Sequence, residues 1–298
     1  MRPPIKVDSH RLKFYWTLLK PRVMSLVVFT GIVGLWLAPG HISLLKALIA
    51  ILCIALGSGA AGALNMWYER DVDALMARTK NRPLPQGKIQ PRQALIFALT
   101  LAIGSVLLMA TFVNILSALY LASAILFYVL VYTMGLKRRT PQNIVIGGAA
   151  GALPPLIGWA AVMNETALLP WILCGIIFLW TPPHFWALAL YQNDDYRRAN
   201  IPMLPVVAGV KTTKNHILFY ILALVTLSIL PVFLRSLGLF YGIIAFVLGL
   251  LFIGLGFKLK VSSDPKEGLR LFFFSILYLF LLFAAMVGDK FLLAPTPL

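Results

Sequence analysis

Long apolar runs recur along the whole chain, and short polar stretches separate them. A membrane-spanning helix needs roughly 20 predominantly apolar residues, and lipid offers no partner for free backbone N–H and C=O groups, so such runs must be helical. The pattern therefore predicts an all-α, polytopic membrane protein with nine transmembrane helices. We expect the spans at 23–39, 44–66, 93–112, 115–134, 142–163, 168–190, 216–235, 238–257 and 269–288.

The fifth span, 142–163, is unusual because glycine and proline interrupt its apolar residues. Small residues let two helices approach closely, whereas a proline inside a helix removes a hydrogen bond and bends or breaks it. We therefore expect an interrupted helix here rather than a straight one. The residues concerned are Gly147, Gly148, Gly151, Pro154, Pro155 and Gly158.

Composition and charge agree with a lipid environment. Hydrophobic residues make up 60% of the 298 positions, and charged residues only 12%, about half the share in a soluble domain. Of the 26 Lys and Arg residues, 23 fall in the N-terminal segment or near the loops after even-numbered spans, and the others are Lys46, Arg235 and Lys290. The positive-inside rule then places the N-terminus in the cytoplasm and the C-terminus on the opposite side. Because topology accounts for the net charge of +16, nucleic-acid binding is not expected.

The N-terminal segment, 1–22, is expected to form part of a single domain covering 1–298. Residues 8–20 mix cations with leucines and aromatic residues, which is typical of a helix lying in the membrane interface; an ordinary juxtamembrane flank is the alternative. No signal peptide is expected, because a short apolar core and a cleavage site are lacking. Cys53 and Cys174 lie in apolar runs without metal-binding spacing, so neither a disulfide nor a zinc site is expected.

Five of the ten acidic residues gather at two places, each in a long loop after an even-numbered span. Long loops in a compact domain are usually functional. Each cluster is followed by a similar Leu-Pro phrase, which resembles an internal repeat in which spans 1–4 are echoed by spans 5–8. Two like-oriented halves would bring the clusters face to face across a central cavity, under a cytoplasmic cap made by the two loops. The clusters are Glu69, Asp71 and Asp73, and Asp194 and Asp195.

Helical spacing sorts the acidic residues of both clusters. If the second span continues as a helix, Asn65, Glu69 and Asp73 share one face, whereas Asp71 points elsewhere. In the second cluster Asp195 falls on the stripe of the sixth span, and Asp194 lies one residue off it. That stripe consists of His184, Leu188, Tyr191 and Asp195.

Carboxylates gathered at the water boundary repel one another unless a cation lies between them. Mg²⁺ prefers oxygen ligands and often binds through few carboxylates together with substrate phosphates, and Arg side chains suit phosphate oxygens. The predicted metal ligands, for two expected Mg²⁺ ions, are Asn65, Glu69, Asp73, Asp194 and Asp195. The predicted diphosphate-binding cations are Arg78, Lys80, Arg82, Arg197, Arg198 and Lys211.

A diphosphate at the mouth of an apolar cavity indicates an isoprenoid diphosphate as substrate. Metal and arginine would stabilise the leaving diphosphate as the allylic C–O bond breaks. The cavity would hold the apolar tail and shield the allylic cation from water. Trp67 is expected either to line this cavity or to belong to the interfacial aromatic belt.

The first acidic segment resembles that of the UbiA-type intramembrane prenyltransferases. The stretch 65–73, followed by 78–85, is similar to the family's Asn-Asp-x-x-Asp-x-x-x-Asp motif and its Arg-Thr-x-x-Arg-Pro segment. Met66 departs from the second position of the motif. Glu69 replaces the usual Asp but still offers a ligand oxygen.

Three further segments, 20–22, 180–189 and 194–207, are similar to the branch of this family that prenylates heme. The resemblance implies that farnesyl diphosphate is joined to the 2-vinyl group of heme B with addition of water, giving heme O and diphosphate. It also implies a bacterial inner membrane and a complex with a heme A synthase or a terminal oxidase. The second motif lacks the Asp-x-x-x-Asp spacing of other branches, so the choice between Asp194 and Asp195 as metal ligand stays open.

His184 lies 11 residues before Asp195, roughly 16 Å deeper along a helix, which suits contact with a macrocycle below the diphosphate. Ligation of heme iron, activation of water as a base and a structural bond to a neighbouring helix all stay open for it. The expected lining of the heme or prenyl cavity is His184, Tyr191, Trp67 and Trp180. The expected catalytic residues are Asn65, Glu69, Asp73, Asp195 and His184.

Two other functions fit parts of the pattern. A prenyltransferase acting on an aromatic quinone precursor would use the same metal clusters, and the surroundings of His184 distinguish it from a heme enzyme. A secondary transporter would also use repeats and broken helices. Transporter sites lie near the bilayer midplane, however, whereas these acidic residues lie at the membrane edge.

Overall fold

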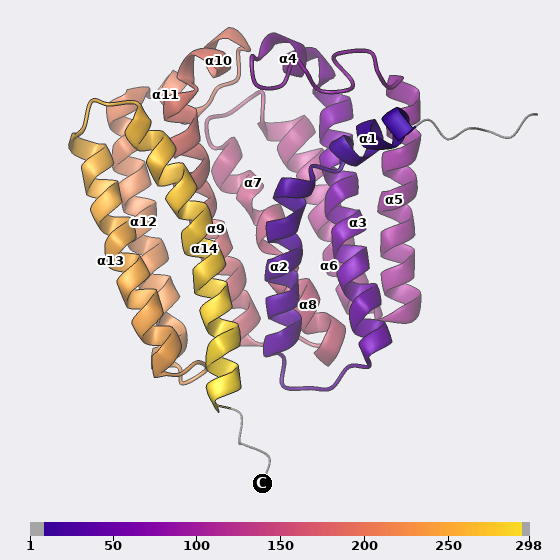
Figure 1. Cartoon of the computed structure of the whole chain (residues 1–298), viewed down its shortest axis with the longest axis vertical. Coiled ribbons are helices and arrows are strands. Elements are labelled where there is room, and N and C mark those ends of the chain that lie inside the picture. Colours follow the sequence, from indigo (N-terminus) through magenta and orange to yellow (C-terminus); the bar gives the residue numbers. More distant parts are fainter. Residues whose placement is uncertain (1–8, 294–298) are drawn as a thin grey trace, which may run out of the picture.

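The computed structural model describes residues 9–293, and within that range the chain is helical and contains no strand. Long helices run side by side in an elongated bundle (Figure 1). Eight spans are long and apolar enough to cross a membrane, and α2 makes the ninth when it is taken with α1 (Ser9–Leu18). The chain is therefore a multi-pass membrane protein, as predicted. The spans are α2 (Pro21–Leu37), α3 (Leu44–Tyr68), α5 (Pro91–Phe112), α6 with η1 (Ile115–Leu126 and Phe127–Leu136), α7 with α8 (Asn143–Ala152 and Pro154–Met163), α9 (Leu168–Tyr191), α12 (Gly209–Phe233), α13 (Leu239–Val261) and α14 (Lys266–Leu293).

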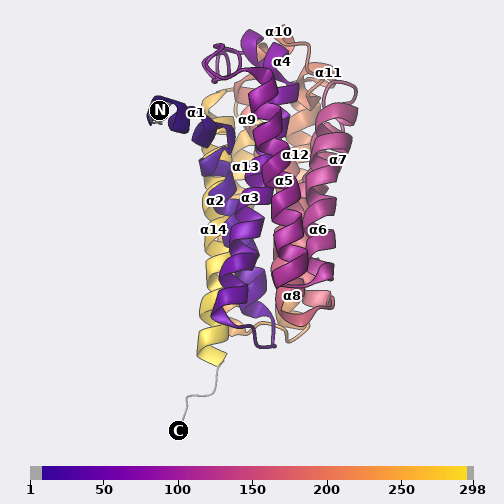
Figure 2. The ribbon, with the colours of Figure 1, turned by 90° about the vertical axis from the view of Figure 1, so that its right-hand side faces the viewer.

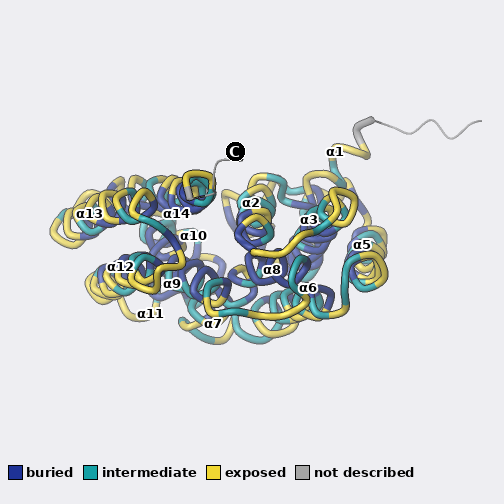
Figure 3. The backbone as a smooth tube through the Cα atoms, turned by 90° about the horizontal axis from the view of Figure 1, so that it is seen from below, coloured by how far each residue is buried: buried dark blue, intermediate teal, exposed yellow. Residues whose placement is uncertain are grey.

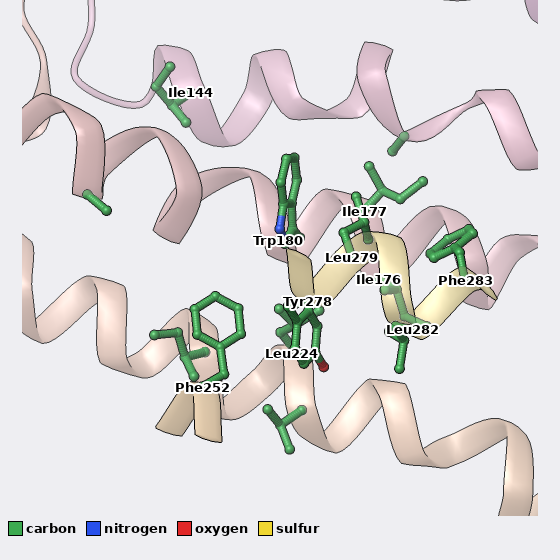
Figure 4. Close-up of a cluster of buried hydrophobic side chains, with 14 of the residues drawn as sticks. Ile144, Ile176, Ile177, Trp180, Leu224, Phe252, Tyr278, Leu279, Leu282 and Phe283 are labelled. Atoms are coloured by element: carbon green, nitrogen blue, oxygen red, sulfur yellow. The ribbon is translucent and has the colours of Figure 1, made fainter. Parts of the chain in front are cut away.

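Buried apolar side chains form two clusters, one in each half of the bundle. One cluster joins α9, α12, α13 and α14 and includes Trp180, Tyr278 and Phe283 (Figure 4). The other joins α3, α5 and α6. The span made by α7 and α8 and the span made by α9 are the most enclosed, with 72% and 67% of an 18-residue apolar stretch buried in each, while α5, α12 and α13 carry exposed outer faces (Figure 3). Those outer faces carry large apolar side chains, which suits contact with lipid.

The predicted interruption of the fifth span is present at Leu153, between α7 and α8. Glycines on α2 and α8 bring these two helices into backbone contact. A β-carbon added at Gly158 would lie 2.0 Å from the carbonyl oxygen of Gly31, and one added at Gly34 would lie 2.0 Å from that of Pro155. Both distances are far below van der Waals contact, so the α2–α8 packing depends on glycine at these positions.

Short helices cap one end of the bundle. After α3, one residue, Glu69, precedes α4 (Arg70–Leu75); after α9, one residue, Gln192, precedes α10 (Asn193–Arg198), and α11 (Leu204–Val207) follows. Figures 1 and 2 show α4 and α10 next to each other at this end, which is also the end that carries α1 and lies opposite the end of α14. The matched breaks support the predicted repeat, and both acidic loops lie in one cap as expected.

Helix α1 covers part of the expected interfacial segment, of which residues 1–8 lie outside the described range. It is bent by 51° from α2. Leu12 and Trp16 are exposed, whereas Leu18 is fully buried. A helix with exposed apolar groups beside the first span agrees with the interfacial alternative.

Candidate active site

Asn65, Glu69 and Asp73 share one face of an almost continuous helix, as their spacing predicts. The backbone N–H of Glu69 donates to the carbonyl of Asn65 at 3.0 Å, and that of Asp73 donates to the carbonyl of Glu69 at 2.8 Å. The α-helical hydrogen-bond pattern therefore passes through the break between α3 and α4. All three side chains are buried, so the two carboxylates require partners.

Asp71 points away from this face, again as predicted. Its side chain is 63% exposed, and Arg138 donates to its two carboxylate oxygens at 2.7 and 2.9 Å. The hydrogen bonds from Arg138 lower the pKa of Asp71. Asp71 thus forms an exposed ion pair beside the buried face and is not part of it.

Two lysines that the sequence did not single out as site residues complete the buried face. Lys20 Nζ donates to Asn65 Oδ1 at 2.6 Å, and Lys137 Nζ donates to Glu69 Oε2 at 2.5 Å. The Asn65 amide also donates to Glu69 Oε2 at 2.9 Å and to Thr133 Oγ1 at 3.2 Å. Lys20 opens the 20–22 segment that resembles the heme-prenylating branch, so a signal for it existed. Lys137 had counted only as a topology-setting charge.

The site gathers more positive than negative charge. Lys20, Lys137 and Arg82 each donate to one of the three side chains Asn65, Glu69 and Asp73. Three basic side chains therefore surround two carboxylates. A polyanion such as a diphosphate would relieve the repulsion among the cations.

The acidic groups of the first cluster differ in how they are satisfied. Arg82 donates to Asp73 Oδ2 at 2.7 Å, and Thr79 Oγ1 donates to the Asp73 carbonyl at 2.8 Å, which fixes the loop after α4. Glu69 Oε1, by contrast, is buried and has no hydrogen-bond partner among the described residues. Buried polar atoms are normally paired, so an orphaned carboxylate oxygen in an oxygen-rich face fits a bound cation.

Metal binding at this face would need ligands from outside the protein. Within residues 9–293, no group of three or more His, Cys, Asp and Glu side chains could hold a metal ion by itself. Cys53 and Cys174 are free thiols. Phosphate oxygens are the additional ligands that Mg²⁺ commonly uses.

Among the predicted diphosphate-binding cations, Arg82 is partly buried and donates to Asp73, while Arg198 is exposed and pairs with Asp195. All of them except Arg82 are exposed on the cap, where a soluble headgroup can reach them. They are Arg78, Lys80, Arg197, Arg198 and Lys211.

The helical hydrogen bonds of the second cluster loosen between α9 and α10 but are not lost. The N–H of Gln192 donates to the Leu188 carbonyl at 2.9 Å, and the Gln192 carbonyl accepts from Tyr196 at 3.3 Å and, in a tighter turn, from Asp195 at 3.1 Å. Tyr191, on the predicted stripe, is 45% exposed. The Asp195 side chain is only 12% exposed and pairs with Arg198, whereas Asp194 is exposed. The geometry thus favours Asp195 over Asp194 as a site residue.

The two acidic segments lie at the same end of the molecule. α4 and α10 are adjacent in both views (Figures 1 and 2), and Val72, Met76 and Tyr196 belong to one buried apolar cluster. Trp67, just before the break in α3, is partly buried, and the guanidinium of Arg70 lies 5.8 Å from its ring centroid. Two segments more than 100 residues apart in the sequence are therefore parts of one cap.

His184 lies buried in α9, and its ring stacks between two aromatic rings. The centroids of Trp180 and Phe272 are 4.2 and 4.5 Å from that of the imidazole. His184 Nδ1 is 2.7 Å from Ser275 Oγ on α14, and Trp180 Nε1 donates to the Ser275 carbonyl at 2.7 Å. The bond to a neighbouring helix, one of the three roles left open for His184, is therefore present, and it uses only one ring nitrogen.

Comparison with known sequences finds relatives over nearly the whole chain. The UbiA prenyltransferase family matches residues 27–283. A protein of Azorhizobium caulinodans named protoheme IX farnesyltransferase is 55% identical to this chain, covering 92% of it and 91% of the relative. A protein of Neorickettsia sennetsu with the same name is 54% identical, covering 95% and 94%.

Solved structures show the same architecture at lower identity. The structure of a digeranylgeranylglyceryl phosphate synthase superposes with a TM-score of 0.80 at 22% identity, covering 95% of this chain and 100% of that one. A UbiA homolog from Archaeoglobus fulgidus bound to GPP and Mg²⁺ superposes with a TM-score of 0.63 at 19% identity, covering 92% and 99%. At these identities the likeness establishes the fold.

Proposed function

The chain belongs to the UbiA prenyltransferase family, and on that basis we propose that it transfers a farnesyl group from farnesyl diphosphate to the 2-vinyl group of heme B. The reaction takes up water and gives heme O and diphosphate. Relatives at 55% and 54% identity that are named protoheme IX farnesyltransferase support this assignment, since the chain covers nine-tenths of their length. Heme B is thus a substrate and not a resident cofactor.

Prenyl transfer by this chain is metal-dependent, and the Archaeoglobus fulgidus homolog bound to GPP and Mg²⁺ supports Mg²⁺ as the metal. Asn65, Glu69 and Asp73 would hold one ion, and Asp195 would hold a second from the facing segment, with Asp194 as the alternative. The orphaned Glu69 Oε1 supports the first position. Bound Mg²⁺ would supply positive charge to the diphosphate oxygens as the allylic C–O bond weakens.

The cations of the site would bind the diphosphate once Mg²⁺ occupies the oxygen ligands. Lys20, Lys137 and Arg82 each bond to one of the three predicted ligand side chains. A cation released from its carboxylate or amide would turn to the diphosphate and stabilise its leaving charge. The exposed cations of the cap would then guide the headgroup in, with Arg78, Lys80, Arg197, Arg198 and Lys211 as the candidates.

The remaining chemistry takes place on the apolar side of the diphosphate. The terminal carbon of the vinyl group attacks the allylic carbon, and the positive charge passes to the carbon beside the macrocycle. Water adds there and loses one proton, so the products are heme O, diphosphate and a proton. The buried α9 surface around Trp180 and His184 excludes bulk water, which protects the cations until attack; Trp67 and Tyr191 are the candidates nearer the cap.

The location of the site follows from the distribution of charge. Twenty-three of the 26 Lys and Arg residues are assigned to the cap side, which supports a cytoplasmic cap and N-terminus in a bacterial inner membrane. The whole chain would act as one domain, with α1 along the membrane surface. A lipid-soluble product would pass directly to a heme A synthase or a terminal oxidase in a complex.

One observation carries the site assignment: a buried Asn65–Glu69–Asp73 face with an unsatisfied carboxylate oxygen lies in the same cap as Asp195. The test is mass analysis of hemes after expression in a bacterial strain that lacks heme O. We expect heme O to accumulate with the native chain and not with the Asp73→Asn variant at equal membrane level. A prenylated aromatic ring without any heme O would instead indicate a quinone-precursor substrate.

A further inference from the structure

Ser275, on α14, is the direct partner of the buried His184 on α9. Its hydroxyl oxygen lies 2.7 Å from Nδ1 of the imidazole. Its backbone carbonyl accepts a hydrogen bond from Trp180 Nε1 at 2.7 Å. Ser275 itself is fully buried, so no solvent competes for these bonds.

The hydrogen bonds of Ser275 determine which nitrogen of His184 carries the proton. A serine hydroxyl has one hydrogen to donate, and Ser275 Oγ donates it to the Phe272 carbonyl at 2.6 Å. The hydroxyl can then only accept from the imidazole, so Nδ1 must be the protonated nitrogen. In a neutral imidazole Nε2 is then the atom that carries the lone pair.

The stacking around the ring limits how a ligand can approach His184. Trp180 covers one face at an interplanar angle of 20°, and Phe272 lies stacked at 26°. Because aromatic rings flank both faces of the imidazole, it cannot stack on a porphyrin. Phe185 meets the ring at an interplanar angle of 83° with centroids 5.0 Å apart, and within the described part of the chain the hydrogen bonds of the ring reach only Nδ1. The lone pair on Nε2 lies in the plane of the ring, as metal ligation requires.

From this geometry we propose that Ser275 is a positioning residue that holds His184 as the Nδ1-protonated tautomer, so that Nε2 binds the iron of the heme substrate. The proposal rests on the proposed function, because it needs heme B in the site. A metal-bound histidine usually donates its other N–H to a fixed acceptor, which sets the tautomer and the ring orientation. The pair formed by His184 and Ser275 supplies that arrangement, with the Phe272 carbonyl fixing the acceptor in turn.

The test uses the full chain in lipid nanodiscs, titrated with ferric heme B without farnesyl diphosphate, and reads the visible absorption and electron paramagnetic resonance spectra of the iron. We expect the native chain to show a histidine-ligated spectrum that His184→Ala loses. Ser275→Ala should bind heme about 10- to 100-fold more weakly, as loss of such an orienting partner does at other metal sites. Ser275→Thr retains the hydroxyl and should keep the native spectrum.

His216 provides the matched control. It lies on α12, exposed, with its Nδ1 2.9 Å from the Thr212 carbonyl of its own helix, so His216→Ala should leave the spectrum unchanged. Because buried substitutions at His184 can prevent folding, a His184→Gly variant supplemented with free imidazole gives a second measurement. Imidazole should restore the spectrum, and it should require a higher concentration when Ser275→Ala is added.

The outcomes separate this proposal from the function it rests on. If the native chain makes heme O but its heme spectrum is unchanged by His184→Ala and by Ser275→Ala, the proposal is overturned and the function stands. Equal imidazole requirements with and without the Ser275 hydroxyl also overturn the positioning role. A native chain that neither binds heme B nor makes heme O overturns both.

Discussion

Lys137 Nζ lies 2.5 Å from Glu69 Oε2, and this contact joins the end of η1 to the junction of α3 and α4. The carboxylate is almost completely buried, with 2% of its side chain exposed. A cation thus occupies a predicted metal ligand when no metal is present. The other oxygen of this carboxylate, Oε1, has no partner among the described residues, so Mg²⁺ and Lys137 would share Glu69 unless the lysine moves to the diphosphate.

Replacing Lys137 should separate its role as the partner of Glu69 from its role in binding the diphosphate. Lys137→Met leaves a buried carboxylate without its ionic partner, a loss of about 3–5 kcal/mol in buried pairs, so the variant should melt earlier without metal. Mg²⁺ should raise its melting temperature more than that of the native chain, because the ion binds only the folded site. The KM for farnesyl diphosphate should rise about 10-fold, the equivalent of one lost contact of ~1.4 kcal/mol.

The control for that experiment is Lys88→Met. Lys88 also lies in the cap, but its ammonium faces the Phe14 ring at 5.3 Å and no carboxylate. It should show the native response to Mg²⁺ and a native KM. An identical Mg²⁺ response in the native chain and in Lys137→Met would contradict a carboxylate shared by Lys137 and the metal.

The helical face predicts a sharp contrast among neighbouring acidic residues. Glu69→Gln and Asp73→Asn should each lower turnover by roughly 100-fold or more, because both remove charge at the predicted metal and diphosphate site. Asp71→Asn removes only an exposed ion pair with Arg138, whose contribution is about 0–1 kcal/mol. Turnover with farnesyl diphosphate and heme B measures the effect, and equal losses at positions 71 and 73 would refute the assignment of the buried face.

The second cluster gives a similar comparison on a different helix. Asp195 is shielded and Asp194 is exposed, so Asp195→Asn should lower turnover much more than Asp194→Asn. The Mg²⁺ concentration for half-maximal activity should rise in the first variant alone. If Asp194→Asn had the larger effect, the ligand choice made from burial would be wrong.

Packing of α2 on α8 is testable with two glycines of the same broken span. A β-carbon at Gly158 would meet the Gly31 carbonyl at 2.0 Å, whereas one at Gly151 meets nothing within 4 Å. Gly158→Ala should therefore destabilise the protein by about 1–3 kcal/mol or more. Gly151→Ala should be neutral or slightly stabilising, because alanine favours helix. Thermal melting in detergent distinguishes them, and equal melting temperatures would contradict the backbone contact.

The first acidic face could be predicted from the sequence because it depends on one local rule. Asn65, Glu69 and Asp73 are four residues apart, and the helical pattern continues through the break. The same rule said less from His184 to Asp195, because the Gln192 carbonyl also accepts from Asp195 in a tighter turn and Tyr191 on the stripe is exposed. Spacing alone does not reveal such a turn.

Contacts between distant segments were beyond the sequence. Lys20 reaches Asn65 across 45 residues and Lys137 reaches Glu69 across 68, and no periodicity links them. The same holds at the other end, where Asp289 accepts hydrogen bonds from the N–H groups of Gly238, just before α13, and of Tyr241 in its first turn. Lys290 there binds the Trp36 carbonyl, which gives one of the three cations outside the cap side a structural role.

The account depends on two acidic segments that bind one diphosphate through metal, and a structure with Mg²⁺ and a non-reactive farnesyl thiodiphosphate tests this most directly. We expect a diphosphate in the cap with Mg²⁺ about 2.0–2.1 Å from ligand oxygens, contributed by Glu69 or Asp73 on one side and by Asp195 on the other. Lys137 should then have moved from Glu69 to a phosphate oxygen. A diphosphate bound by only one segment, with Lys137 still on Glu69, would contradict the account.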